Sequence, residues 1–222
     1  MAYHEGHWDE ACSAVNEFLA EVEAGSPHYL EPSARTLRGQ VRVARGDLAE
    51  AIADTSRAVD FGRTSGDAQS LLPALAAHAR VLGIAGKLGD AEQIVVELLE
   101  TDLQGLNWWL GDVAPVVRSL GREAEFLARF GQNERLTRWE EAARAILAGD
   151  FGRAMQGYAA MGAKPQEADA RLLAAREAPA ATEAAREHAQ RAVDFYRSVG
   201  AELLAQEAER LLEIPKTETS TG

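Results

Sequence analysis

Apolar residues recur at steps of three and four along most of the chain. Before Gly46 they fall at Leu30, Ala34, Leu37, Val41 and Ala44, and after it at Leu48, Ile52, Thr55 and Val59. A similar stripe runs on both sides of Gly86. This spacing places side chains on one face of an α-helix, and no segment shows the alternation that is typical of a strand. The pattern predicts an all-α chain.

A short motif divides these stripes and repeats every 40 residues. Gly6, Gly46 and Gly86 are each followed by a large apolar residue two places later and by an alanine five places later. A fourth copy, outside the strict period, begins at Gly149. Glycine adopts the left-handed conformation that ends a helix without a Cβ penalty. Each copy is therefore interpreted as a tight turn between two antiparallel helices.

The residues around each turn carry two further expectations. Asp47 and Asp150 directly follow their glycines, where a carboxylate suits the start of the second helix. The alanine of each motif is expected where the two helices approach most closely, because a larger side chain would cost packing energy there.

The same periodicity extends beyond the regular repeats and predicts about 11–12 helices. We expect one array over residues 1–213, with regular repeats at 6–101, an irregular pair at 103–133, and C-terminal pairs with a capping helix at 134–213. The polar stretch 214–222 follows Glu213 and is expected to be a disordered tail.

The turn segment resembles a known repeat family. The residues Arg-Gly-Asp-Leu-Ala-Glu-Ala-Ile at 45–52, with Gly39 seven places before Gly46, are similar to the turn and second helix of tetratricopeptide repeats. That resemblance implies a right-handed superhelix of antiparallel hairpins, an α-α solenoid. The period of 40 exceeds the usual 34, and Arg38 and Arg42 stand where the family has bulky apolar residues.

The longer helices resemble the superhelical C-terminal regions of bacterial signalling ATPases, including MalT-like and LuxR-type regulators and ATPase-linked adenylate cyclases. The stretches 158–168 and 195–201 carry this second resemblance. It implies a sensor or docking module carried behind an NTPase or cyclase domain. No phosphate-binding loop of the Gly-x-x-x-x-Gly-Lys-Ser/Thr type occurs in the 222 residues.

The register also leaves the first hairpin incomplete. Only five residues precede Gly6, so the helix after it lacks its partner, and we expect an exposed apolar flank there. This predicts a fragment of a longer protein or a mis-set start, and it allows a homo-oligomer to form through the uncapped helix.

Charge and cysteine content narrow the partners. A formal net charge of −12 disfavours nucleic acid and anionic membrane surfaces, which require basic faces. Cys12 is the only cysteine, and no apolar run reaches the ~18 residues of a membrane span, so a cytoplasmic location is expected.

His4, His7 and Cys12 lack the spacing of a metal site, and no base accompanies Cys12 as a nucleophile. No metal or cofactor is predicted.

Two sets of residues are candidates for an interaction surface. Arg35, Arg38, Arg42 and Arg45 follow steps of three, four and three along one side of a predicted helix. They could hold an acidic or phosphorylated ligand, or pair with the chain's own acids such as Asp47 and Glu50.

Trp108 and Trp109 form the second candidate set. Adjacent helical residues point about 100° apart, so one ring is expected in the core and the other could anchor a partner.

The function predicted from the sequence is a non-catalytic module for protein–protein interaction or regulation. Two alternatives stay open at this point: a sensor that binds a metabolite in a concave groove, and a self-associating scaffold.

Overall fold

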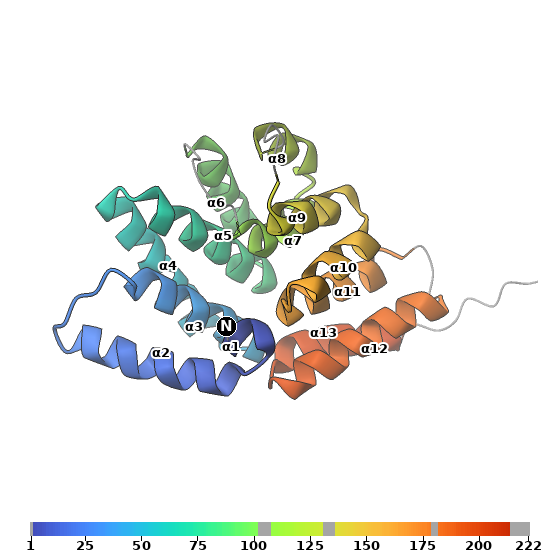
Figure 1. Cartoon of the computed structure of the whole chain (residues 1–222), viewed down its shortest axis with the longest axis horizontal. Coiled ribbons are helices and arrows are strands. Elements are labelled where there is room, and N and C mark those ends of the chain that lie inside the picture. The colour runs from blue at the N-terminus through green and yellow to red at the C-terminus, as the bar shows by residue number, and fades with distance from the viewer. Residues whose placement is uncertain (1, 102–107, 131–135, 179–181, 214–222) are drawn as a thin grey trace, which may run out of the picture.

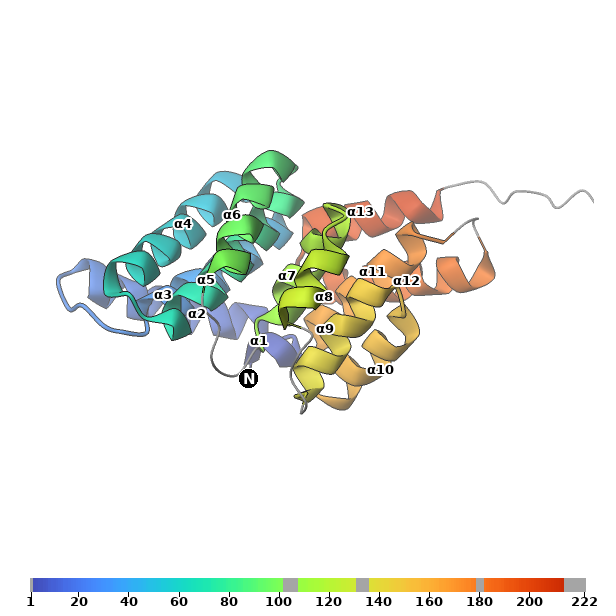
Figure 2. The ribbon, with the colours of Figure 1, turned by 90° about the horizontal axis from the view of Figure 1, so that it is seen from above.

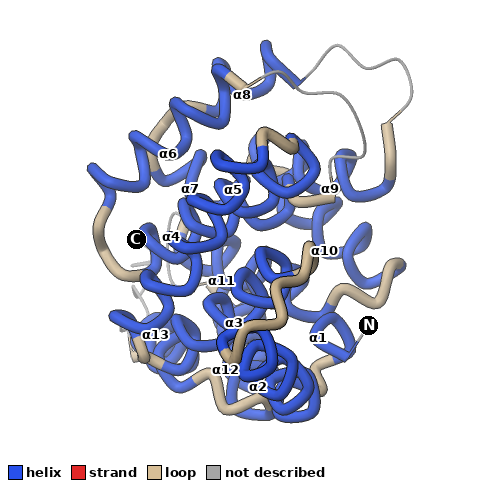
Figure 3. The backbone as a smooth tube through the Cα atoms, turned by 90° about the vertical axis from the view of Figure 1, so that its left-hand side faces the viewer, coloured by secondary structure: helices blue, strands red, loops and turns tan. Residues whose placement is uncertain are grey.

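The computed structural model describes residues 2–101, 108–130, 136–178 and 182–213. Within these ranges the chain forms thirteen helices and no strand. Figure 3 shows helices joined by loops. The all-α class is confirmed. None of the helices in these ranges combines the length and the hydropathy that crossing a bilayer requires.

The helices follow one another with short connections. Those of the first half are α1 (Ala2–Glu5), α2 (Trp8–Glu23), α3 (Glu31–Arg45), α4 (Leu48–Ser65), α5 (Ala68–Ile84) and α6 (Leu88–Glu100). Those of the second half are α7 (Leu110–Ser119), α8 (Glu123–Phe130), α9 (Arg138–Ala148), α10 (Phe151–Ala160), α11 (Lys164–Arg176), α12 (Glu183–Ser198) and α13 (Glu202–Leu212). Twelve of them correspond to helices predicted from the sequence, and the short α1 is the addition.

The repeated glycines occupy the turns that the motif predicts. Gly6, Gly46, Gly86 and Gly149 all have positive φ, between 74° and 102°. Asp150 then caps α10, since its carboxylate accepts a hydrogen bond from the backbone N–H of Arg153 at 3.1 Å. Asp47 precedes α4 without such a side-chain bond.

The motif alanines lie at close helix contacts, also as predicted. Ala51, Ala91 and Ala154 are fully buried. At the α3–α4 contact, a Cβ added to Gly39 would lie 2.6 Å from Cγ2 of Thr55 and 3.1 Å from the carbonyl oxygen of Ala51. Only glycine allows the two backbones to come this close.

Helices that are neighbours in the sequence pack side by side, and the chain bends into an arch (Figures 1 and 2). In the middle, α5 contacts both α3 and α7, while α7 packs on α9. The largest buried cluster fills this middle part and includes Leu75, Trp109 and Tyr158.

The two ends of the arch touch, and a second buried cluster fills the junction. The indole of Trp8 is stacked on Tyr3 with ring centroids 5.3 Å apart and lies edge-on to Phe195 at 6.0 Å. The ammonium of Lys164 donates to the carbonyl oxygen of Glu5 at 3.0 Å. In Figure 1 the blue first helices and the red last helices meet at the bottom of the molecule.

This junction corrects the expectation of an uncovered first helix. Tyr3 and Trp8 are buried against the C-terminal helices, and Val199 lies beside Gly6. No large apolar side chain of α2 is strongly exposed. The premise for self-association through an uncapped α2 is therefore wrong, because α12 and its following turn cover the apolar residues at the start of α2.

Candidate interaction surface

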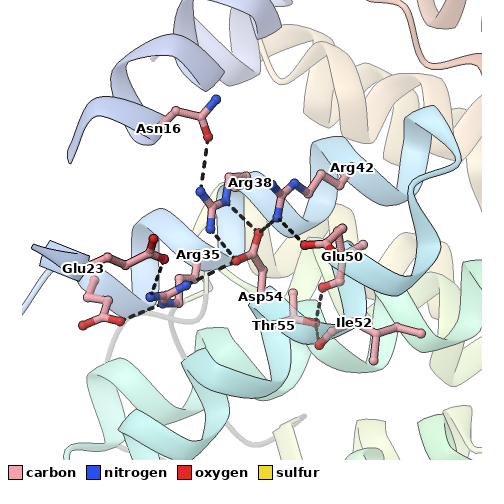
Figure 4. A network of polar contacts seen from close by, with 11 residues as sticks. Asn16, Glu23, Arg35, Arg38, Arg42, Glu50, Ile52, Asp54 and Thr55 are labelled. Atoms are coloured by element: carbon pink, nitrogen blue, oxygen red, sulfur yellow. Dashed lines mark hydrogen bonds and ion pairs between the residues drawn. The ribbon is translucent and has the colours of Figure 1, made fainter. Parts of the chain in front are cut away.

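Three arginines of α3 converge on one carboxylate of α4 (Figure 4). Arg38 binds Asp54 at two points, with Nε 2.7 Å from Oδ2 and a terminal nitrogen 2.7 Å from Oδ1. Arg42 donates to Oδ2 at 2.6 Å, and Arg35 lies 3.4 Å from Oδ1. Steps of three and four residues bring these guanidiniums to the side of α3 that faces α4.

This arginine cluster is mostly withdrawn from water. The side chains of Asp54 and Arg35 are only 4% and 5% exposed. Three positive groups around one carboxylate need further acceptors, and Glu50 supplies one 3.6 Å from Arg42. Asn16 of α2 supplies another to Arg38 at 3.3 Å. Of the two readings of the arginine stripe, the structure shows pairing with the chain's own acids, and it adds Asp54 as the central acceptor.

Arg35 also ties together the two ends of the loop between α2 and α3. Its guanidinium donates to Glu23 at 3.2 Å, where α2 ends, and to Glu31 at 2.7 Å, where α3 begins. Burial alone would lower the pKa of Arg35, but the hydrogen bonds to Glu31 and Glu23 and the negative charges of Glu31 and Asp54 raise it above its usual value. The guanidinium therefore remains charged and clamps the loop.

The loop clamped in this way carries an aromatic tip, which we define as His28, Tyr29 and Leu30 with Phe18 of α2 behind them. His28 is stacked on Tyr29 at 4.7 Å and lies edge-on to Phe18 at 5.3 Å. Its Nδ1 accepts a hydrogen bond from the backbone N–H of Leu30 at 3.1 Å. Tyr29 is 73% exposed and Leu30 is 44% exposed, so the tip presents apolar surface to solvent from an ordered loop.

Arg45 does not join the other three arginines. It points to the junction of the two ends, where it donates to Asp9 at 2.5 Å and to the carbonyl oxygen of Val199 at 3.3 Å. The four predicted arginines therefore divide into a cluster of three and one residue at the junction.

The tryptophan pair divides between core and surface as expected, but both residues lie in the turn before α7 and not in a helix, so the helical spacing is not the reason. Trp109 is buried in the central cluster, whereas Trp108 is 44% exposed. The structure places neither ring in the arginine cluster.

A chain of buried polar groups joins four helices where the two ends of the arch meet. The Tyr3 hydroxyl donates to Gln40 at 2.9 Å, and the amides of Gln40 and Gln166 donate to the two oxygens of Asp112 at 3.0 Å and 3.1 Å. Burial raises the pKa of Tyr3, and the neighbouring Asp112 and Asp169 charges add to this. The only sequence signal for this network is glutamine and aspartate inside otherwise apolar stripes.

The residues considered for metal binding have other contacts. His4 lies 3.3 Å from the amide oxygen of Gln166 and against the ring of Trp139, while His7 is exposed beside Glu5. Burial raises the pKa of the Cys12 thiol, which disfavours its nucleophilic form. Across the part of the chain that the structure describes, no three His, Cys, Asp or Glu side chains gather in a metal-binding group.

Comparison of the chain with protein-family models, with curated proteins and with solved structures found no match in any of the three.

Proposed function

We propose that this protein is a non-catalytic interaction module, a tetratricopeptide-like array that binds another polypeptide. The observation that carries the proposal is the aromatic tip. Exposed aromatic side chains dominate the energetics of many protein interfaces, and Tyr29 is the most exposed large hydrophobic residue in the described part of the chain.

The tip is held in place before any partner arrives, which favours binding. Arg35 connects both ends of the loop, and His28 fixes the backbone of Leu30. A loop ordered in advance loses less conformational entropy when it binds, so more of the contact energy becomes affinity. The arginine cluster thus supports the proposed surface from behind and is not itself the contact.

The surrounding charge favours a basic partner. Glu17, Glu21 and Glu23 are exposed on α2 near the tip, and the chain carries a net charge of −12. Opposite charge at the rim of an interface speeds association and selects the partner. We propose a segment that pairs apolar side chains with flanking lysines or arginines.

The test is site-specific photocrosslinking in the native host. A photoreactive phenylalanine at position 29 should give one discrete protein adduct, whereas the same group at Ala14, which is exposed on α2 away from the tip, should not. The purified partner should then lose affinity for the double variant Tyr29→Ala, Leu30→Ala by tenfold or more, an order expected for an interface hot spot. An adduct of twice the chain mass would instead support the self-associating scaffold, and equal labelling at both positions would refute the surface.

A further inference from the structure

A cavity of about 130 Å³ lies between α5, α7, α11 and α13. Its walls are mainly aliphatic and include Ile84, Val116, Leu172, Leu173 and Leu204. Two charged pairs also line it. Arg80 and Asp169 have side chains 8% and 13% exposed and mark its inner end, whereas Arg176 and Glu207 are far more exposed and mark its mouth.

The inner pair leaves hydrogen-bonding capacity unused. Arg80 donates one hydrogen bond, from a terminal nitrogen to Oδ2 of Asp169 at 2.6 Å, and makes no other with the part of the chain that the structure describes. A guanidinium has five N–H donors. Arg80 is therefore a largely buried cation that lines a cavity with most of its donors unpaired by protein groups. None of its nitrogens is among the fully enclosed atoms that lack a partner, so these donors remain accessible to a small molecule.

The carboxylate of Asp169 can also accept further hydrogen bonds. Oδ1 accepts from the Tyr196 hydroxyl at 2.7 Å and Oδ2 from Arg80, and each carboxylate oxygen can accept a second bond. The inner end thus offers both donors and acceptors, on groups of opposite charge.

These charges restrict the ligand. A plain carboxylate would meet Arg80 but would place a second negative charge beside Asp169, and a plain amine would meet Asp169 but would lie against Arg80. A molecule with both groups satisfies each side, because like charges in a poorly solvated site are strongly unfavourable and opposite charges attract.

Shape and lining restrict the ligand further. The cavity is close in size to the roughly 150 Å³ of an engineered cavity that binds benzene, so it encloses about six non-hydrogen atoms, and further atoms of a ligand can extend into its open mouth. Its aliphatic walls favour a branched hydrocarbon group.

We propose that this cavity binds a small aliphatic α-amino acid as its zwitterion. The carboxylate accepts hydrogen bonds from the unpaired N–H groups of Arg80, and the ammonium donates to Asp169. The side chain packs on Leu172 and Leu204. The walls come from the first half of the chain (α5 and α6) and the second (α7, α11 and α13), so the ligand connects the two halves beside the junction of the ends.

The test compares branched aliphatic amino acids with related molecules that lack the ammonium group, the carboxylate or both charges. L-valine and L-leucine should bind with 1:1 stoichiometry in calorimetry and raise the melting temperature of the full chain. Isovalerate and isoamylamine each lack one charged group of the zwitterion and isovaleramide lacks both, so each should bind at least about tenfold more weakly. Equal binding of isovalerate would show a simple anion site, and no binding of either amino acid would overturn the proposal.

Two variants locate the site. Ser119 lines the cavity and is exposed, so Ser119→Trp should block entry without disturbing the core and abolish amino-acid binding. Ser13→Trp, on exposed α2 surface away from the cavity, is its control. Arg80→Lys keeps the positive charge but loses the forked donors, and should weaken binding about tenfold or more. If Arg80→Lys fails to fold, the comparison of Ser119→Trp with Ser13→Trp still tests the site. Unchanged amino-acid binding in Ser119→Trp would refute it.

Discussion

The guanidinium of Arg38 and the carboxylate of Asp54 form a two-point contact, with both N–O distances at 2.7 Å. This contact joins α3 to α4 at the centre of the arginine cluster. Arg35 and Arg42 share the same carboxylate. Removing Asp54 would therefore leave three guanidiniums without their common acceptor.

Asp54→Ala should destabilise the fold by about 3–5 kcal/mol, the range seen when one partner of a buried ion pair is removed. Denaturant unfolding followed by circular dichroism measures this. Asp60→Ala removes an exposed carboxylate from the same helix, paired with Arg63 at 3.4 Å, and should cost about 1 kcal/mol or less. Equal effects of the two variants would contradict the central role of Asp54.

Trp8→Ala should cost about 3–5 kcal/mol, because it removes a buried ring and its stacking on Tyr3 from the junction of the two ends. The same change at Trp108, which is 44% exposed and lies at the surface, should cost about 1 kcal/mol or less. Thermal unfolding of both variants gives the comparison. A small effect at Trp8 would show that the contact between the ends contributes little to stability.

Glycine-to-alanine changes in two helices should act in opposite directions. Gly39→Ala places a methyl group 2.6 Å from Cγ2 of Thr55 and should destabilise the protein by about 1–3 kcal/mol through overpacking. Gly89→Ala meets nothing within 4 Å and should stabilise it by about 0.5–1 kcal/mol. The midpoints of urea unfolding measure both. A Gly39→Ala variant as stable as the unaltered protein, or more stable, would contradict the close approach of α3 and α4.

Acid should weaken the fold through His78. Burial, assisted by the nearby Arg63 charge, lowers the pKa of His78 below its usual value. The unfolded chain then binds more protons than the folded chain, so stability falls as the pH drops below about 6.5, the usual histidine value, until it reaches the lower folded-state pKa.

His78→Asn tests this assignment. The Thr55 hydroxyl donates to the carbonyl oxygen of Ala51 at 2.9 Å, so it accepts from Nδ1 of His78 at 2.8 Å, and an asparagine amide can replace that donor. Unfolding free energies at pH 7.5 and 5.5 should differ less in His78→Asn than in the unaltered protein. His7→Asn, at an exposed histidine, should leave the difference unchanged.

The helices and turns could be predicted because their determinants are local. A glycine at each turn and an alanine five residues later are readable in sequence, and both Gly46 and Ala51 occupy the expected places. The contact between the ends could not be predicted this way. Trp8 and Phe195 are 187 positions apart, and nothing in either stripe specifies the other as its neighbour.

The candidate surface was predictable only in part. The spacing of the arginines placed Arg35, Arg38 and Arg42 together, but their acceptor depended on how α4 turns against α3. The aromatic tip gave no periodic signal, because His28, Tyr29 and Leu30 lie in or beside a loop. Likewise, no local pattern in the sequence indicates that Arg80 of α5 and Asp169 of α11 lie together.

The contact between the first and last helices has a consequence for how such a chain can evolve. An open stack of hairpins gains or loses a unit at little cost, since each unit touches only its neighbours. Here Arg45 meets the carbonyl oxygen of Val199, and Lys164 meets that of Glu5. Duplicating or deleting one hairpin in between would change the arc and separate these groups, so the number of hairpins is fixed by geometry, as the number of strands is in a closed barrel.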